Sequence, residues 1–318
     1  MNAQHPLQAE LEASRMQASR DELVERLMRA LRKDGGSEPL KGLRLHRLSA
    51  PTELAHSVSD PAFCVIAQGS KEGFLGEYRY QYDPMHYLLV TAELPIVSHV
   101  IEASPERPYL SLSLKLDPVT VGAVMVETGQ LATHDETHVR ALDVSALDAD
   151  LLDAILRLVR LLDNPTEAPF LAPLITREII FRLLLGEQGD RLRYIATQGG
   201  HAHRIARAIE RLRNELDHPL RVEDIARDLG MSVSSFHHHF KAVTAMSPLQ
   251  FQKQVRLQEA RRLMLSEDLD AATAGYRVGF NDPAHFNREY KKTFGLPPLS
   301  DVKRLREQAA PNERLSAG

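Results

Sequence analysis

Hydrophobic residues recur at helical spacing near the start of the chain. Leu23, Leu27 and Leu31 follow one another at intervals of four, with charged residues between them. This spacing places the three leucines on one face of an amphipathic helix. The turn-forming residues at 33–37, Lys-Asp-Gly-Gly-Ser, then end the helix. The pattern therefore predicts a helix within the first forty residues.

After this helix the pattern changes to that of short β-strands. The clearest strand is 109–116, where leucines alternate with Ser, Ser and Lys, as in a strand with one buried face. The apolar runs 63–66 and 86–90 predict two further strands, and 74–78 predicts a hairpin with its turn near Gly76. Several short strands at close spacing favour a small antiparallel barrel or sandwich.

Helical periodicity returns in the middle of the chain. Residues 151–162 carry a broad apolar stripe, and a second helix covers about 171–185. The apolar helices at 149–185 are the predicted dimer surface. Residues 186–200 contain four glycines among polar residues, a composition typical of a link between domains.

A helix-turn-helix pattern occupies about 222–243. It follows a helix whose apolar residues, at 205–216, lie on one face. Next come a short helix around 223–229, then Gly230, then a longer helix that Ser232 can cap. Two short helices on either side of a glycine-containing turn form this motif.

The same pattern occurs again at about 270–294. A shift of 50 residues aligns the second helices of the two motifs, and a shift of 49 aligns Gly230 with Gly279. The change of one residue falls in the turn, where an insertion costs least. The pairs that match at the shift of 50 are Phe236/Phe286, Phe240/Tyr290, Lys241/Lys291, Pro248/Pro298 and Leu249/Leu299.

One long helix, from Ser247 to about Leu265, joins the two motifs. Ser247 can cap it, with Pro248 at its first position, and Asp282-Pro283 repeats this arrangement at the start of the last recognition helix. Nineteen residues at ~1.5 Å each span roughly 28 Å. This is close to the ~34 Å of one DNA turn, so two recognition helices can enter successive major grooves. The spacing therefore indicates duplex DNA as the ligand.

The charge distribution agrees with a nucleic-acid partner at one end of the chain. The formal net charge is −4, but residues 201–318 hold 19 Lys and Arg against 15 Asp and Glu. The first 200 residues hold 20 against 28. An acidic body with a basic end is a feature of chains that contact nucleic acid at that end. The acidic excess of the body is interpreted as a solvated surface.

Composition limits the class of protein further. A chain of 318 residues that is 43% hydrophobic is long enough for about two domains. No window approaches ~18 consecutive apolar residues and no signal-peptide pattern opens the chain, so neither a membrane span nor secretion is expected. The single cysteine, Cys64, excludes an intramolecular disulfide and fits a reducing cytoplasm.

Residues 201–308 resemble the C-terminal domain of the AraC/XylS-type transcriptional regulators. The resemblance rests on motifs in order along the chain, which are Pro219-Leu220-Arg221-Val222-Glu223-Asp224-Ile225-Ala226, Gly230-Met231-Ser232, Phe236 with Phe240-Lys241, Met246-Ser247-Pro248, Arg256-Leu257 with Ala260-Arg261, and Tyr276-Arg277-Val278-Gly279-Phe280-Asn281-Asp282-Pro283 with His285-Phe286. Residues 40–130 resemble the cupin-like N-terminal domain of one AraC-type subgroup. That match includes Gln68-Gly69-Ser70-Lys71, Leu75-Gly76, Tyr82, Leu94-Pro95 and Pro108-Tyr109-Leu110.

The resemblance implies an α+β protein with a regulatory function. A cupin-like antiparallel β-barrel with flanking helices is expected at 1–190 for sensing or dimerisation, a linker at 191–200, and an all-α DNA-binding domain of two helix-turn-helix motifs at 201–308. The expected function is that of a cytoplasmic, sequence-specific transcriptional regulator that responds to a small-molecule effector. Its expected partners are duplex DNA, a second copy in a homodimer, and RNA polymerase if the protein is an activator.

The resemblance also carries DNA-contacting positions onto this chain. The positions expected to contact bases are Ser234, His237, His238, Pro283, Ala284, Asn287 and Arg288, with His285 nearby. Arg288 can pair bidentately with guanine and Asn287 with adenine, whereas Pro283 and Ala284 offer only apolar contact. Lys241, Lys291 and Lys292 are expected to contact phosphates, which adds affinity without sequence information.

Three departures from the family pattern concern mainly the second motif. Ala271 and Ala274 stand where larger aliphatic residues are usual, which implies a looser core there. Arg221 stands where Ser or Thr usually caps the first short helix. The closing Ser-Pro-x-x-Tyr of the family appears as 297–301, Pro-Pro-Leu-Ser-Asp, without its tyrosine.

No metal, cofactor or catalytic site is expected. Consecutive helical residues point ~100° apart, so 237–239, His-His-His, cannot converge on one ion. These histidines contact the DNA groove or form a solvated face. His134 and His138 lack further ligands at suitable spacing, and His86 and His99 each lack the other ligands that a cupin-type metal enzyme needs. An enzyme is therefore not expected.

Two features of the N-terminal domain allow alternative interpretations. Tyr78, Tyr80 and Tyr82 alternate along one strand, so their rings share a face and either line an effector pocket or pack against neighbours. Cys64 is either a small buried hydrophobe or a sensing thiol. The alternative function is a ligand- or protein-binding cupin module with a weakened DNA domain, or a cupin-type enzyme.

Overall fold

The computed structural model describes residues 4–129, 140–196, 201–218 and 220–309. The chain divides into an N-terminal unit, residues 1–204 with 242–245, and a C-terminal unit, residues 205–241 with 246–318. Among the described residues no helix is both long enough and apolar enough to span a bilayer.

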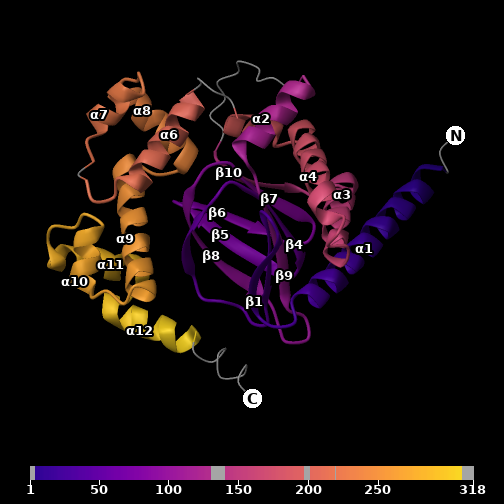
Figure 1. The fold of residues 1–318 in the computed structure, drawn as a ribbon, viewed down its shortest axis with the longest axis horizontal. Coiled ribbons are helices and arrows are strands. Elements are labelled where there is room, and N and C mark those ends of the chain that lie inside the picture. Colours follow the sequence, from indigo (N-terminus) through magenta and orange to yellow (C-terminus); the bar gives the residue numbers. More distant parts are fainter. Residues whose placement is uncertain (1–3, 130–139, 197–200, 219, 310–318) are drawn as a thin grey trace. The chain divides into compact units, whose positions relative to one another are not determined.

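The N-terminal unit combines ten strands and several helices within the described residues. Figure 1 shows how they are arranged. In chain order the elements are α1 (Gln4–Ala30), β1 (Gly35–Leu40), β2 (Leu43–Leu48), β3 (Ala55–Ser59), β4 (Ala62–Gln68), β5 (Ser70–Leu75), β6 (Tyr78–Tyr82), β7 (His86–Val90), β8 (Leu94–Glu102), β9 (Tyr109–Lys115), α2 (Pro118–Glu127), β10 (Leu142–Ala146), α3 (Ala149–Arg160), the 3₁₀ turn η1 (Leu161–Asp163), α4 (Ala168–Leu185) and α5 (Gly189–Ala196).

The strands form two antiparallel sheets. A six-stranded sheet has the order β1-β2-β9-β4-β7-β10, and a four-stranded sheet has the order β3-β8-β5-β6. The sheets are continuous in sequence at the β4–β5 turn, where Gly69 has a φ of +85°. The predicted hairpin is present as β5 and β6, paired from Leu75 with Tyr78 onward around Gly76. The predicted antiparallel β-domain is confirmed.

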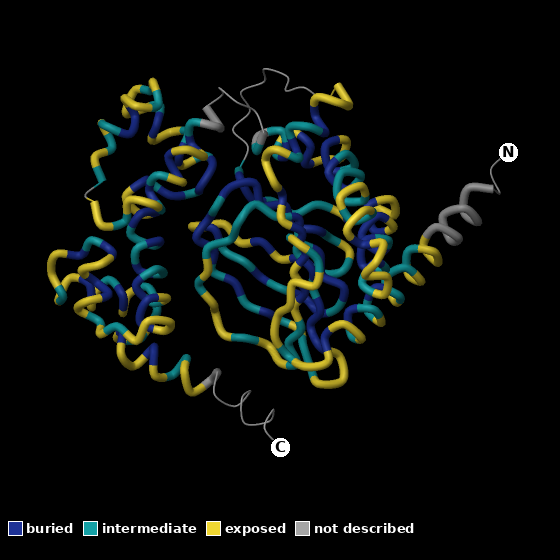
Figure 2. Tube along the Cα trace, viewed as in Figure 1, coloured by how far each residue is buried: buried dark blue, intermediate teal, exposed yellow. Residues whose placement is uncertain are grey.

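Helices cover one face of the six-stranded sheet. The predicted leucines of α1 are buried there, together with the alternating leucines of β9 and the apolar stripe of α3. Figure 2 shows the buried positions running along these strands and along the helix faces beside them. Alternation in β9 and helical spacing in α1 and α3 therefore predicted the two sides of the same core.

Two segments differ from the sequence-based expectation. Residues 35–37, predicted to be only a turn, open β1, which is held by backbone pairing with β2 and buries almost no side chain. A strand of this kind has no hydrophobic pattern to detect. Within the predicted linker at 191–200, the first six residues belong to α5. Leu192 is fully buried and Arg191 bonds to Asp143 of β10 at 2.7 Å.

The C-terminal unit is helical. Its elements are α6 (His201–Asn214), α7 (Val222–Asp228), α8 (Val233–Thr244), α9 (Pro248–Ser266), α10 (Ala271–Arg277), α11 (Pro283–Phe294) and α12 (Pro298–Ala309). In Figure 1 the long helix α9 runs from the region of α6 and α8 to that of α10 and α11. The two predicted helix-turn-helix motifs are α7–α8 and α10–α11.

Candidate nucleic-acid interface

Helix α8 is oriented by its cap and its buried face. Ser232 accepts a hydrogen bond from the Ser235 amide at 3.2 Å, as the sequence predicted. Phe236 and Phe240 have no exposed surface, and Phe240 packs against Phe251 of α9 with ring centroids 5.4 Å apart. The opposite face of α8 therefore points to solvent.

Helix α11 is built in the same way. Asp282 accepts a hydrogen bond from the Ala284 amide at 2.9 Å, and Pro283 occupies the first helical position. Phe286 and Tyr290 are fully buried, and the Phe286 ring lies 5.2 Å from that of Phe280. The helix ends at Gly295, whose left-handed φ of +82° suits a glycine.

The two exposed faces match position by position. Each face presents residues at relative positions 1, 4, 5 and 8, which lie together on one side of a helix. They are Ser234, His237, His238 and Lys241 on α8, and Ala284, Asn287, Arg288 and Lys291 on α11, separated by 50 residues in every case. The structure thus brings these eight predicted residues onto two equivalent surfaces.

The remaining predicted residues lie at the edges of the α11 face. His285 and Lys292 are exposed, and Pro283 is half-buried at the helix start. The His285 ring lies 5.6 Å from that of Phe280. His285 is therefore held partly by packing against Phe280, although it is exposed.

Most acidic groups near the α11 face are already engaged. Asp282 caps the helix, and Glu289 pairs with Lys253 of α9 at 2.7 Å, a contact that lowers the pKa of its carboxyl. Within the part of the C-terminal unit that the structure describes, no carboxylate forms an ion pair with Lys241, Arg288, or the two lysines that follow on α11. These cations remain available for an external anion.

The long helix α9 holds both motifs. Its start is a complete capping box, in which the Ser247 hydroxyl accepts from the Gln250 amide and the Gln250 side chain accepts from the Ser247 amide. Farther along, Arg256 donates to the carbonyl oxygens of His218 and Gly279 at 2.6 and 3.3 Å. One arginine therefore contacts the segment before the first motif and the turn of the second.

A buried ionic cluster fixes the orientation of α11. Asp301 of α12 has no exposed surface and accepts two hydrogen bonds from Arg261 of α9, at 2.7 and 2.8 Å. The Tyr290 hydroxyl of α11 donates to the same carboxylate at 2.8 Å. Burial acts to raise the pKa of Asp301, but the bonds from Arg261 and Tyr290 outweigh it and lower that pKa.

This cluster explains one departure from the family pattern. Asp301 ends the segment in which the closing tyrosine is absent, and its carboxylate joins α9, α11 and α12. The missing tyrosine is visible in the sequence, whereas the role of the aspartate was not predicted from it. The available signal was an acidic residue at a position of α12 that faces the apolar core.

The other departures are visible as local geometry. Ala274 is fully buried in the core of the second motif. A Cβ added at Gly275 would lie 3.0 Å from the Phe286 ring, so the glycine allows the close approach of α10 and α11. Arg221 precedes α7 without a side-chain cap.

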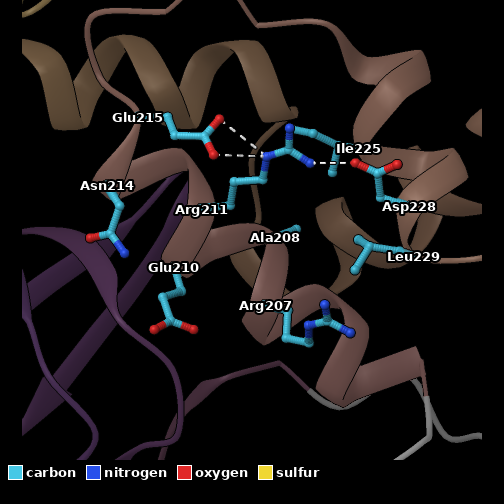
Figure 3. Close-up of a pocket in the computed structure, with 9 residues that line it drawn as sticks. All are labelled: Arg207, Ala208, Glu210, Arg211, Asn214, Glu215, Ile225, Asp228 and Leu229. Carbon is cyan, nitrogen blue, oxygen red and sulfur yellow. Dashed lines mark hydrogen bonds and ion pairs between the residues drawn. The ribbon is translucent and has the colours of Figure 1, made fainter.

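A shallow pocket of about 260 Å³ lies between α6 and α7 (Figure 3). Arg211 crosses it and pairs with Glu215 at 3.1 Å and with Asp228 at 2.7 Å. The residues predicted to contact DNA do not line this pocket. The ion pair of Arg211 with Asp228 joins α6 to α7 and so supports the first motif.

In the N-terminal unit, the three predicted tyrosines of β6 differ in exposure. Tyr80 and Tyr82 are buried, whereas Tyr78 is 43% exposed and carries the Arg140 guanidinium 3.4 Å above its ring. Cys64 is partly buried, and burial raises the pKa of its thiol to about 11. A protonated thiol is a weak nucleophile, which disfavours the interpretation of Cys64 as a sensing residue.

The histidines considered as metal ligands have other contacts or lie outside the described residues. His86 lies 2.8 Å from Asp83, and His99 lies 2.9 Å from Glu72 and stacks on Phe74. Among the residues described, no group of three His, Cys, Asp or Glu could hold a metal ion. His134 and His138 lie outside the described residues.

Two family models match the chain. Residues 39–191 match the model described as the AraC-type transcriptional regulator N-terminus, and residues 225–304 match that of a helix-turn-helix domain. These ranges include most of the strands and both candidate recognition helices.

Curated relatives match parts of the chain. The transcriptional regulator ExsA of Pseudomonas aeruginosa is 27% identical over 134 residues, which are 41% of this chain and 46% of ExsA. The probable thc operon regulatory protein of Rhodococcus erythropolis is 30% identical over 152 residues, 45% of each chain. The chain thus spans less than half the length of these relatives.

Solved structures of ToxT from Vibrio cholerae share the fold. One, without ligand, matches with a TM-score of 0.54 at 10% identity and covers 85% of this chain and 98% of ToxT. Another, with an unsaturated fatty acid bound, matches with a TM-score of 0.52 at 10% identity. It covers 82% of this chain and 94% of ToxT. At this identity the likeness concerns the fold alone.

Proposed function

Because the chain belongs to the AraC-type transcriptional regulators, we propose that it is a sequence-specific DNA-binding regulator whose N-terminal unit responds to an effector. The observation that carries this proposal is the pair of equivalent exposed faces on α8 and α11, which repeat at a spacing of 50 residues. Two such faces joined by one helix suit the successive major grooves of a duplex.

Each exposed side chain has a role in this proposal. Arg288 reads a guanine, Asn287 reads an adenine, and Ala284 with Pro283 contacts a thymine methyl. On α8, Ser234, His237 and His238 approach base edges. His285 lies close to the same groove.

The lysines on both faces contact phosphates. Lys241 on α8 and Lys291 with Lys292 on α11 neutralise the backbone on either side of the groove. Because these contacts are independent of sequence, they set affinity and register, while the neighbouring side chains set specificity.

The N-terminal domain at 1–190 is proposed to bind a small-molecule effector and a second copy of the chain. A fatty acid is bound to the similar fold of ToxT, which supports a ligand-binding role here. Phe170 and Leu174 of α4 are 74% and 52% exposed, and exposed apolar side chains at this spacing support the predicted dimer surface. The proposed setting is the cytoplasm, with RNA polymerase as a partner if the protein activates transcription.

The test is DNA binding by the full-length protein. Fragments from the promoter regions of the native genome and shuffled fragments of equal length are compared by mobility shift at several salt concentrations. The proposal expects at least one native fragment to bind well above the shuffled background. Equal binding to native and shuffled fragments at every salt concentration would exclude sequence-specific recognition.

A further inference from the structure

Polar side chains lie on the inner faces of the two sheets of the N-terminal unit. On the six-stranded sheet, residues that alternate with the helix-facing core point to the other side. Cys64 pairs across strands with Ser113, and Ile66 and His46 each pair with Ser111. Directly paired residues share a face, so this face carries a thiol, hydroxyls and an imidazole beside apolar groups.

The four-stranded sheet contributes Lys71 to the same interior. Lys71 of β5 pairs with Tyr82 of β6 and with Val100 of β8, so the three side chains share a face. Lys71 interacts electrostatically with Cys64 on the other sheet. The Tyr82 hydroxyl likewise interacts with that of Tyr109 on β9. These interactions indicate that the inner faces of the two sheets lie toward each other here.

Lys71 has no anionic partner among the described residues. Cys64 is protonated because burial raises the pKa of its thiol, and no carboxylate is near enough to influence Lys71. Burial, and then the charge of Lys71, lowers the pKa of His46, so the imidazole is neutral at pH 7. Burial lowers the pKa of Lys71, because a positive charge without a counter-ion between the sheets costs free energy. A bound anion would offset this cost.

The interior retains accessible surface around this charge. Lys71, Cys64, Ser111 and Ser113 are all partly exposed, whereas the helix-facing side chains of the same strands are buried. Apolar neighbours on the interior face include Ile66, paired with Ser111, and Val100, paired with Lys71. The inner faces of the two sheets therefore bring together one cation, several hydroxyls and apolar side chains.

We propose that Lys71 binds the carboxylate of a monoanionic effector between the two sheets, with the hydroxyls of Tyr82 and Tyr109 beside it. A single lysine matches one negative charge, whereas a phosphate ester brings about −1.5 to −2 at neutral pH. Hydroxyl donors and the ammonium suit carboxylate oxygens, and the apolar neighbours suit an apolar body on the ligand. This inference rests on the proposed effector-binding role and assigns the chemical class of the effector.

The first test is the stability of Lys71→Met without added ligand. Methionine keeps the length of the side chain and removes the uncompensated charge, so the full-length variant should unfold about 2–4 °C above the wild type if about 1 kcal/mol is regained. Lys115→Met, which removes an exposed lysine of β9, should leave the melting temperature unchanged. A lower melting temperature for Lys71→Met would show a structural role and overturn the proposal.

The second test uses monocarboxylates with neutral counterparts. Full-length protein is titrated with octanoate, decanoate, benzoate and phenylacetate, and with the primary amide of each acid, while thermal unfolding is followed. At least one acid should raise the melting temperature of the wild type and of Lys115→Met, its amide should act at least ten-fold more weakly, and Lys71→Met should lose the response. If no acid stabilises the wild type, or if Lys71→Met responds equally, the proposal is wrong.

These outcomes are independent of the DNA-binding proposal. Ligand binding is measured on protein alone, and DNA selectivity is measured on wild-type protein without added acid. Selective DNA binding without stabilisation by any acid would overturn only the proposed Lys71 site. Stabilisation by an acid together with unselective DNA binding would overturn the proposed regulatory function and leave the proposed ligand site standing.

Discussion

Arg288 and His238 occupy equivalent positions 50 residues apart, yet their chemistry differs. A guanidinium can form two parallel hydrogen bonds to guanine, whereas an imidazole forms one. Asn287 and His237 differ in the same sense. The α11 face therefore offers stronger base discrimination than the α8 face, although the buried residues behind both faces are nearly the same.

We expect Arg288→Ala to weaken binding to the preferred DNA fragment by about 1–3 kcal/mol and to relax selection at one base pair. The reason is the loss of a bidentate contact. Competitive mobility shifts with all four bases at each position measure both effects. His238→Ala is the matched variant on the α8 face, and it should weaken binding to the preferred fragment by less than Arg288→Ala does. An unchanged base preference in Arg288→Ala would contradict the assigned role.

Lys241→Ala should lower the affinity for native and for shuffled DNA fragments by similar factors, because a phosphate contact carries no sequence information. The slope of log affinity against log salt should also fall by about one. Lys303, exposed on α12, provides the control variant. A loss of affinity for the native fragment alone would show that Lys241 contacts bases.

At the scale of elements, the orientation of α11 depends on contacts from α9 and α12. Asp301 brings together Arg261 and Tyr290 in a site with no exposure. The second motif has small residues in its first helix, and this ionic cluster supplies a directional connection among the three helices. The predicted looseness of the second motif is thus opposed by a contact that spans 40 residues of sequence.

Asp301→Asn should destabilise the C-terminal unit by about 3–5 kcal/mol, since it leaves Arg261 buried without a counter-charge. Urea unfolding followed by circular dichroism measures the change, with Asp268→Asn at an exposed ion pair as control. A cost no larger than that of the control would show that the cluster contributes little.

The same cluster predicts a pH dependence. The pKa of Asp301 is lower in the folded protein, so its stabilising contribution is complete above the unfolded value of ~3.9 and is lost as pH falls below it. Wild-type stability should therefore decline toward low pH more steeply than that of Asp301→Asn. Parallel curves for the two proteins would contradict this linkage.

At the scale of the whole molecule, the net charge of −4 combines an acidic N-terminal part with a C-terminal part of +4. The excess in the C-terminal part is small, so non-specific attraction to DNA is limited. Groove contacts and the pairing of two copies must then supply much of the affinity in the proposed function. The proposed function therefore requires dimerisation for high affinity to DNA, and this requirement can be tested.

Phe170→Glu should convert the proposed dimer to a monomer and lower affinity for the preferred DNA, because it places a charge in an apolar contact surface. Multi-angle light scattering gives the mass, and mobility shifts give the affinity. Leu54→Glu changes another exposed apolar residue of the N-terminal unit, outside the helices, and should leave both unchanged. A wild-type monomer, or a dimer that persists in Phe170→Glu, would exclude this surface.

Local periodicity by itself determined the faces of the individual elements. Spacing of three and four residues is enough to orient α8 and α11, since a helix relates residues that are near in sequence. The repeat at 50 residues then predicted both recognition faces, with Arg288 of α11 at the position of His238 on α8 and Lys291 at that of Lys241. The alternation in β9 and the cap at Ser232 were also predictable, for the same local reason.

Only the tertiary structure decided what lies across from each face. A period of two indicates that Cys64 and Ile66 share a side of β4. The order of strands in the sheet then places Ser113 beside Cys64, and the packing of the second sheet brings Lys71 within electrostatic range of Cys64. The partnership of Asp301 with Arg261 likewise depends on how α9 and α12 pack. Such pairings join residues far apart in sequence, and the free energy that selects them comes from burying all the faces at once.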